Sequence, residues 1–144
     1  MPRYMLLIKA SPDAENPEAT TPEIFEEMTT FNENLNAAGV LVSGEGLRPT
    51  NVDSYRLSYS SDGPPQVTEG PFDVKKEAHV CGWWILKTKD ADEALSWAKK
   101  VPFKEGELVM RRIAEMDDFG DQVSESVRDR EEKLREELEK QNQK

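Results

Sequence analysis

The sequence has very few of the residues on which disulfide, metal and redox chemistry depend. Its 144 residues include one cysteine, Cys81, and one histidine, His79. A single cysteine cannot form an internal disulfide, and a transition metal would have to be held mainly by carboxylates. The sequence also contains no CxxC, HExxH, Gly-rich phosphate loop or GxSxG motif, the signatures of zinc sites, nucleotide sites and serine hydrolases. We therefore expect no metal and no cofactor.

Long apolar runs and positive charge are also scarce. No apolar segment near Met1 is long enough for a signal peptide or a membrane helix, which predicts a cytoplasmic protein. The formal net charge is -10, with acidic residues along the whole length. Nucleic acid and anionic membranes would repel such a chain, so we expect neither as a partner.

Hydrophobic periodicity predicts one α+β domain over residues 1–116. Helices are predicted from Thr21 to Gly39 and from Asp90 to Pro102, each with a capping residue at its start and a stop residue at its end. This order of elements predicts a split βαβ sandwich, in which a mostly antiparallel sheet has both helices on one face. Strands are predicted at residues 3–10, 40–47, 54–60, 80–86 and 106–113, and a turn at 62–65 makes the third strand part of a hairpin.

The predicted strands at residues 3–10 and 80–86 are apolar on both faces. In the second of these, Trp83 and Ile85 point one way, and the two residues that alternate with them point the other way. Two helices can cover only one face of the sheet. We therefore expect a second copy of the chain, stacked sheet on sheet about a two-fold axis, to cover the other face. The alternative is a polar, solvated far face.

Residues 117–144 are predicted to form a charged helical extension outside the domain. Aliphatic residues recur there at helical intervals, at Val123, Val127, Leu134 and Leu138. Pairs of an acid followed four residues later by a base stabilise a helix by about 0.2–0.5 kcal/mol each. Two interpretations stay open: a solvated C-terminal helix that frays, and a helix that packs across the dimer or onto a partner.

Several short segments match a known pattern in the same order along the chain. They are RYMLLIKA at residues 3–10, AGVLVSGEGLRP at 38–49, TEGPF at 68–72, GWWIL at 82–86, DADEALSWAKKVP at 90–102 and GELVMRRI at 106–113. Over residues 3–114 the chain resembles the YCII-related superfamily, and more narrowly its DGPF-motif branch. This resemblance implies a ferredoxin-like α+β fold and a homodimer that forms an α+β barrel, sheet to sheet.

The resemblance implies less about function. The superfamily includes small enzymes, among them a dehydrochlorinase of a chlorinated hydroxyquinol for which a His-Asp pair has been proposed. That pair is absent here, because the first helix opens with Thr21-Pro22-Glu23 and Val101 precedes Pro102. The chain also departs from the branch signature, since Glu69 replaces its aspartate.

Three residues are candidates for acid/base chemistry: Glu69, Glu45 and His79. A glutamate caps a turn poorly, so the Glu69 carboxylate before Gly70-Pro71 is free to act elsewhere; the alternative is a solvated loop carboxylate. His79, just before a strand, is a candidate general base, with a surface histidine as the alternative. Glu45 lies at a strand end where the mouth of a binding site would form.

The candidates for substrate binding surround these residues in the sequence. Arg48 would clamp an anion, and Phe72 and Lys76 follow the Gly-Pro corner. Trp83 and Trp84 would line a cavity, with core or dimer packing as the alternative. Cys81 is interpreted as a small buried residue rather than a nucleophile.

Two functions stay open. The first is a cofactor-free enzyme, a lyase, isomerase or hydrolase that carries out proton transfer, elimination or hydrolysis on a small oxygenated or aromatic metabolite. The second is a non-catalytic homodimeric binding or interaction module that uses the C-terminal helix. A cavity in which Glu69 lies within about 6 Å of a basic or hydroxyl group favours the first. Tryptophans that fill the space between the sheets, with Glu69 in bulk solvent, favour the second.

Overall fold

The computed structural model of the protein describes residues 1–143 and divides the chain into two compact units. The first unit extends from Met1 to Arg112, and the second begins at Ile113. No helix in the described part of the chain is both long enough and apolar enough to cross a membrane.

The first unit contains six strands and two α-helices. The strands are β1 (Arg3–Lys9), β2 (Leu41–Gly46), β3 (Tyr55–Ser60), β4 (Gly63–Glu69), β5 (Val80–Lys87) and β6 (Leu108–Arg112). The helices are α1 (Pro22–Ala37) and α2 (Ala91–Ala98), and two short 3-10 helices, η1 (Pro12–Glu15) and η2 (Pro17–Ala19), precede α1.

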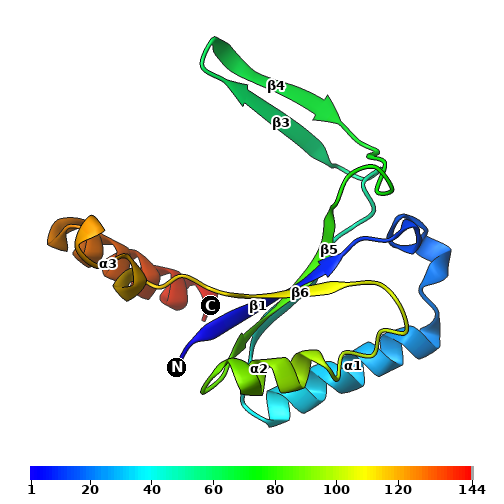
Figure 1. Ribbon diagram of the computed structural model, residues 1–144, viewed down its shortest axis with the longest axis horizontal. Helices are drawn as coiled ribbons and strands as arrows, with labels where there is room; N and C mark the ends of the chain where they lie inside the picture. The colour runs from blue at the N-terminus through cyan, green and yellow to red at the C-terminus, as the bar shows by residue number, and fades with distance from the viewer. Residues whose placement is uncertain (144) are drawn as a thin grey trace. The chain divides into compact units, whose positions relative to one another are not determined.

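Four of the strands form an antiparallel sheet in the order β2-β5-β1-β6. Helix α1 connects β1 to β2 and α2 connects β5 to β6, and both helices lie on the same face of the sheet (Figure 1). This is the topology of two split βαβ units. The predicted ferredoxin-like α+β fold is confirmed.

Local capping interactions determine where the two helices begin. The Thr21 hydroxyl accepts a hydrogen bond from the Ile24 N–H at 3.3 Å, and the Asp90 carboxylate accepts one from the Glu93 N–H at 2.9 Å. Gly39 follows α1 with a φ of 72°, a left-handed conformation that favours glycine. The predicted starts of both helices and the predicted end of α1 therefore rest on contacts within a few residues, whereas α2 ends at Ala98, short of the predicted end at Pro102.

The hydrophobic core lies between the sheet and the helices. Leu6 of β1 and Leu86 of β5 are fully buried there, and the Trp84 ring packs edge-on against Phe31 of α1 with 5.3 Å between ring centroids. The Trp84 indole N–H donates to the Asn32 side-chain oxygen at 2.7 Å. The only polar atom of this buried ring is thus satisfied inside the core.

Within residues 1–112, no helix covers the opposite face of the sheet (Figure 1). We call this surface the open face. Its apolar residues are half-buried, except for Val109, which is 40% exposed. They alternate along the strands with the core residues: Met5, Leu7, Trp83, Ile85 and Val109.

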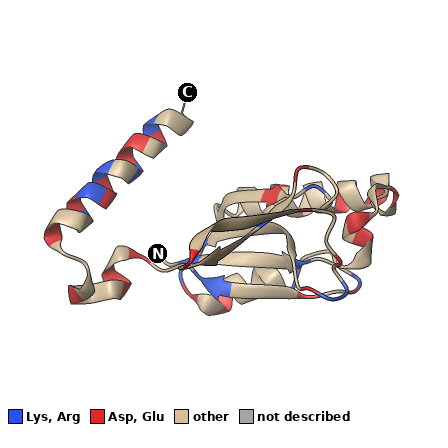
Figure 2. Ribbon diagram, turned by 90° about the horizontal axis from the view of Figure 1, so that it is seen from above, with Lys and Arg blue, Asp and Glu red and all other residues tan. Residues whose placement is uncertain are grey.

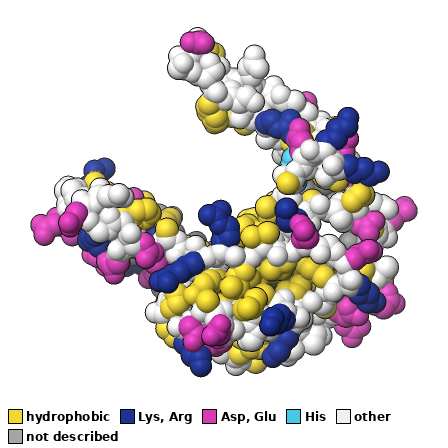
Figure 3. Space-filling view, viewed as in Figure 1, with side chains coloured by type: hydrophobic (Ala, Val, Ile, Leu, Met, Phe, Trp, Pro, Cys, Tyr) yellow, Lys and Arg dark blue, Asp and Glu magenta, His cyan; other side chains and the backbone are white. Residues whose placement is uncertain are grey.

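The predicted hairpin does not join the main sheet. Strands β3 and β4 pair only with each other among the described residues and form a separate two-stranded sheet (Figure 1). The hairpin projects over the open face, and a hollow separates the two in the space-filling view (Figure 3). The Gly70 N–H donates to the Ser54 carbonyl at 2.8 Å, which continues the β3–β4 pairing to the base of the hairpin.

The second unit contains a 3-10 segment, η3 (Met116–Gln122), and a long helix, α3 (Glu125–Asn142). The Ser124 hydroxyl caps α3 by accepting a hydrogen bond from the Val127 N–H at 3.2 Å. Acidic and basic side chains alternate along α3 (Figure 2). Its aliphatic residues Val127, Leu134 and Leu138 are each 40–48% exposed.

Candidate functional site

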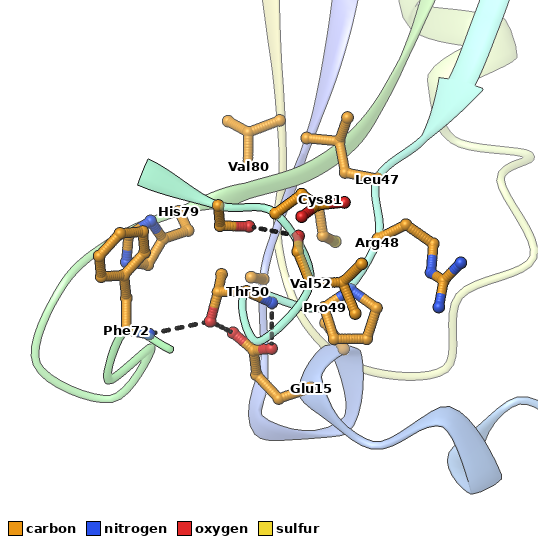
Figure 4. Close-up of a pocket in the computed structure, with 14 residues that line it drawn as sticks. Glu15, Leu47, Arg48, Pro49, Thr50, Val52, Phe72, His79, Val80 and Cys81 are labelled. Carbon is orange, nitrogen blue, oxygen red and sulfur yellow. Dashed lines mark hydrogen bonds between the residues drawn. The ribbon is translucent and has the colours of Figure 1, made fainter. Parts of the chain in front are cut away.

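A cavity of about 500 Å³ lies where the end of β2 and the start of β5 meet the Gly-Pro corner (Figure 4). Its wall also includes η1 and the loop between β2 and β3. Most of this wall is apolar, formed by Ala10, Ala14, Leu47, Pro49, Val52, Phe72 and Val80. The ionisable side chains of the wall are Glu15, Arg48, Asp53, His79 and Cys81.

Thr50 ties three segments of this wall together. The Glu15 carboxylate of η1 accepts hydrogen bonds from the Thr50 N–H at 2.7 Å and from the Thr50 hydroxyl at 2.6 Å. The same hydroxyl accepts a hydrogen bond from the Phe72 N–H at 2.9 Å (Figure 4). Because both carboxylate oxygens of Glu15 are engaged, this acid is a structural part of the wall.

Gly70 lets the corner approach the β2–β3 loop closely. A Cβ at this position would overlap the Thr50 carbonyl oxygen and would lie 3.4 Å from the Ser54 carbonyl oxygen. The Gly70-Pro71 peptide bond is cis. The Gly-Pro-Phe part of the motif therefore has a structural role, since it seats Phe72 against the wall.

A stack of three side chains lies at one side of the cavity, and two of them, Phe72 and His79, line it. The Phe72 and His79 rings lie nearly parallel, 15° apart, with 5.5 Å between their centroids (Figure 4). The Arg56 guanidinium from β3 lies over the Phe72 ring, 4.4 Å from its centroid. Arg56 is also paired with the Glu77 carboxylate, so Glu77 holds one end of the stack.

His79 is oriented by the same carboxylate. Its Nε2 atom lies 3.4 Å from a Glu77 oxygen. This contact lacks hydrogen-bond geometry, and the buried Nε2 has no hydrogen-bond partner within residues 1–143. The imidazole is therefore half-buried beside an acid.

Cys81 lines the cavity as a neutral thiol. Burial raises the pKa of Cys81; a backbone hydrogen bond offsets part of this rise, and the nearby Glu15 carboxylate adds a smaller increase. A thiol with a raised pKa is a poor nucleophile at neutral pH, because the thiolate is the reactive form. This agrees with the interpretation of Cys81 as a small buried residue.

The sequence model of the YCII-related domain matches residues 2–117, most of the chain. The chain belongs to the YCII-related family. A search of curated proteins gives no match. The matched range contains the whole sheet, the hairpin and every residue that lines the cavity, so the cavity is a feature of the YCII-related domain.

Three predicted site residues of this YCII-related domain meet at the cavity. Arg48 lies at the rim, with its guanidinium extended, and Phe72 and His79 form the opposite side (Figure 4). Lys76 lies in a neighbouring cavity of about 320 Å³, and His79 lines both cavities. His79 therefore separates a mostly apolar cavity from one that contains lysines.

The other predicted site residues do not line the cavity. Glu69 is exposed at the end of β4, directly opposite Tyr55 in the hairpin. Glu45 and Trp83 pair across β2 and β5 on the open face. Trp84 is in the core. Their roles in catalysis or substrate binding stay predictions.

Four important residues of the site were not predicted from the sequence. Glu15 is one of several acids in a proline-rich loop, and its partner Thr50 is 35 positions away. In the sequence, Arg56 is an ordinary polar residue of a predicted strand. Only Glu77, two residues before His79 in the segment after the Gly-Pro corner, carries a local signal that could have been used.

Proposed function

We propose that this YCII-related protein is a homodimeric small-molecule-binding protein whose cavity takes a small, largely apolar carboxylate. The supporting observation is the cavity of about 500 Å³, with an apolar wall and a cationic side chain at its rim. Small-molecule sites have volumes of roughly 300–1,000 Å³, mostly apolar walls and a few polar groups that orient the ligand. A ring or short branched chain with one carboxylate fits this description.

Arg48 is the group that recognises the carboxylate. It makes no ion pair or hydrogen bond with any residue in the described part of the chain, so its guanidinium is available to a ligand. Of the two acids in the wall, Glu15 is held by Thr50 and Asp53 is exposed. A guanidinium presents two parallel N–H groups that match the two oxygens of a carboxylate ligand. A neutral amide ligand does not match this pair of donors equally well.

His79 is the group that exchanges a proton with the bound molecule. An imidazole is the most common general base in enzymes, and here the ring position is fixed by Phe72 and Glu77. The Glu77 carboxylate lies 3.4 Å from Nε2, on the side of the ring away from a free approach, and keeps the imidazole in place. This arrangement supports proton transfer or elimination next to the carboxylate, without a cofactor.

The homodimer is proposed from the open face. Its five apolar residues span three adjacent strands, β5, β1 and β6, and a contiguous apolar surface of this kind marks an interaction site. Two sheets that pack face to face lie about 10 Å apart, with interdigitated side chains. Trp83, on β5, supplies the largest side chain for such packing.

A second candidate function rests on α3. Its three exposed aliphatic residues lie on a helix that is otherwise charged, as in a helix that packs onto a partner. In that case the protein is a non-catalytic interaction module.

Benzoate and benzamide, two probes of the same shape, test the proposed recognition. Because the chain has one histidine, its imidazole NMR signals report binding next to His79, and the Arg48 variant assigns that binding to the cavity of about 500 Å³. We expect benzoate to shift these signals and Arg48→Gln to weaken benzoate binding about 10–100-fold, the value of a charge-assisted contact. Arg130→Gln, which removes the same charge from exposed α3, is the matched control.

Benzamide should bind the wild-type protein and Arg48→Gln equally weakly. Equal binding of benzoate and benzamide to the wild-type protein would contradict a carboxylate site. An Arg48→Gln affinity equal to that of Arg130→Gln would contradict the role of Arg48.

A further inference from the structure

The β3–β4 hairpin has one apolar face that no other element of residues 1–112 covers. Leu57 of β3 lies directly opposite Val67 of β4, and these residues are 45% and 62% exposed. Tyr55 and Tyr59 extend the same face and are 53% and 78% exposed. The other face is polar and includes the directly opposed pair Ser58 and Gln66.

An uncovered two-stranded hairpin is at best marginally stable in water. The hairpin here buries none of its own large side chains, so its two strands gain little from their pairing alone. An apolar surface that packs against it would supply the missing stabilisation. The hairpin therefore requires an occupant on its apolar face.

The space next to the hairpin is bordered by a second apolar surface. The hairpin projects over the open face, and hydrophobic side chains lie on both sides of the hollow between them (Figure 3). The two surfaces belong to one chain and face a common space. A body seated in this hollow touches both surfaces at once.

We propose that the hairpin is an arm that packs on a second copy of the chain and holds it against the open face. This inference rests on the homodimer of the proposed function and adds a second contact to it. A two-fold dimer is isologous, so one contact between two chains covers both open faces and both hairpins.

Charge complementarity favours a second copy as the occupant. Glu45 of β2 pairs with Trp83, and Arg111 of β6 pairs with Met5, so both charged side chains lie on the open face, at its two outer strands. A two-fold axis parallel to the strands places β2 of one protomer over β6 of its partner. By the strand registers, Glu45 is level with Val109 of β6, two residues from Arg111, so Glu45 of one protomer faces Arg111 of the partner subunit diagonally, once on each side of the axis.

The arm also links the dimer to the cavity. Arg56, on the polar face of the hairpin, lies over Phe72 and pairs with Glu77, the acid beside His79. A partner that holds the hairpin in place therefore holds Arg56 on the stack as well. Loss of the partner should loosen the side of the cavity that contains His79.

The test compares two double variants in the full chain. Leu57→Ser with Val67→Ser removes the centre of the apolar face, and Ser58→Ala with Gln66→Ser changes an opposed pair on the polar face as the matched control. Sedimentation velocity from about 0.1 to about 50 µM gives the dimer dissociation constant. Since each dimer contains both arms, we expect the first variant to dissociate at least about 100-fold more readily and the control to change less than about threefold.

Hydrogen exchange supplies a second readout that does not depend on a variant. We expect the β3–β4 amides of the wild-type protein to exchange at least about tenfold more slowly at 50 µM than at 0.1 µM. Slow exchange at a concentration where sedimentation shows a monomer would mean that the hairpin is covered within one chain, and it overturns the proposal.

The outcomes separate the arm from the homodimer. A wild-type dimer whose affinity is unchanged in the Leu57→Ser, Val67→Ser variant overturns the arm and leaves the homodimer intact. In that case Leu7→Glu, on the open face, should still dissociate the dimer. A monomer at 50 µM overturns both the arm and the homodimer, while the benzoate experiment tests the cavity separately.

Discussion

Replacing Thr50 with valine removes one hydroxyl and keeps nearly the same side-chain shape. That hydroxyl donates to Glu15 at 2.6 Å and accepts from the Phe72 N–H at 2.9 Å. The third contact, from the Thr50 N–H to Glu15 at 2.7 Å, involves the backbone and survives the substitution. The variant therefore releases the Gly-Pro corner from the β2–β3 loop and removes one of the two hydrogen bonds that hold η1, without removing bulk.

The expected loss of stability is about 2–4 kcal/mol. A hydrogen bond to a charged group contributes roughly 1.5–3 kcal/mol, which we discount to about 1 kcal/mol because the Glu15 site is only partly buried. A part-buried Phe72 N–H left without a partner costs about 1–3 kcal/mol more. Thr50→Ser, the matched control, keeps the hydroxyl and loses one methyl group, at a cost below about 1 kcal/mol.

Urea unfolding followed by tryptophan fluorescence measures this difference. All three tryptophans, Trp83, Trp84 and Trp97, lie in the first unit, so the signal reports the unit that contains the cavity. Thr50→Val should also weaken benzoate binding more than Thr50→Ser does, since Phe72 and His79 lose their anchor. If the two variants unfold within about 0.5 kcal/mol of each other, the hydroxyl does not hold the wall together and the reasoning is wrong.

Two further predictions concern the thiol and the core. Because the pKa of Cys81 is raised in the folded protein, the thiol should react with a disulfide reagent more slowly in the folded than in the urea-unfolded chain; equal rates would contradict its burial. In the unfolded chain the Cys81 thiol ionises at a lower pH than in the folded protein. The contribution of Cys81 to the free energy of unfolding, measured against Cys81→Ala, is therefore complete below about pH 8.5 and is lost as the pH rises above it. Leu86→Ala should cost about 2–5 kcal/mol, because the side chain is fully buried. Leu95→Ala, at a position 42% exposed, should cost much less, and urea unfolding distinguishes the two.

The proposed function and the arm make the site depend on assembly. His79 is positioned by Phe72 and Glu77, and both are held by Arg56 of the hairpin. If the hairpin needs a partner for its own stability, ligand affinity at the cavity should fall on dilution together with the dimer. A ligand that prefers the ordered cavity then stabilises the dimer by the same free energy by which the dimer strengthens ligand binding.

The helix starts and strand positions could be predicted because their causes are local. Thr21 and Asp90 cap their helices through hydrogen bonds that span three residues, and the alternation around Trp83 and Trp84 reflects the geometry of a single strand. The order of these elements then leaves few ways to arrange an antiparallel sheet with two helices. The departure of the hairpin from that sheet was not predicted, because strand periodicity does not say which strands pair.

The sequence by itself determined the ferredoxin-like fold, the two-sided apolar strands, and the presence of His79, Phe72 and Arg48 in segments near one end of the sheet. Only the tertiary structure decided which side chains form the cavity. Glu15 and Thr50 are 35 positions apart, and Arg56 and Glu77 are 21 positions apart, so no local pattern joins them. Such contacts depend on how loops close after the strands have paired, and that closure is set by the packing of the whole domain.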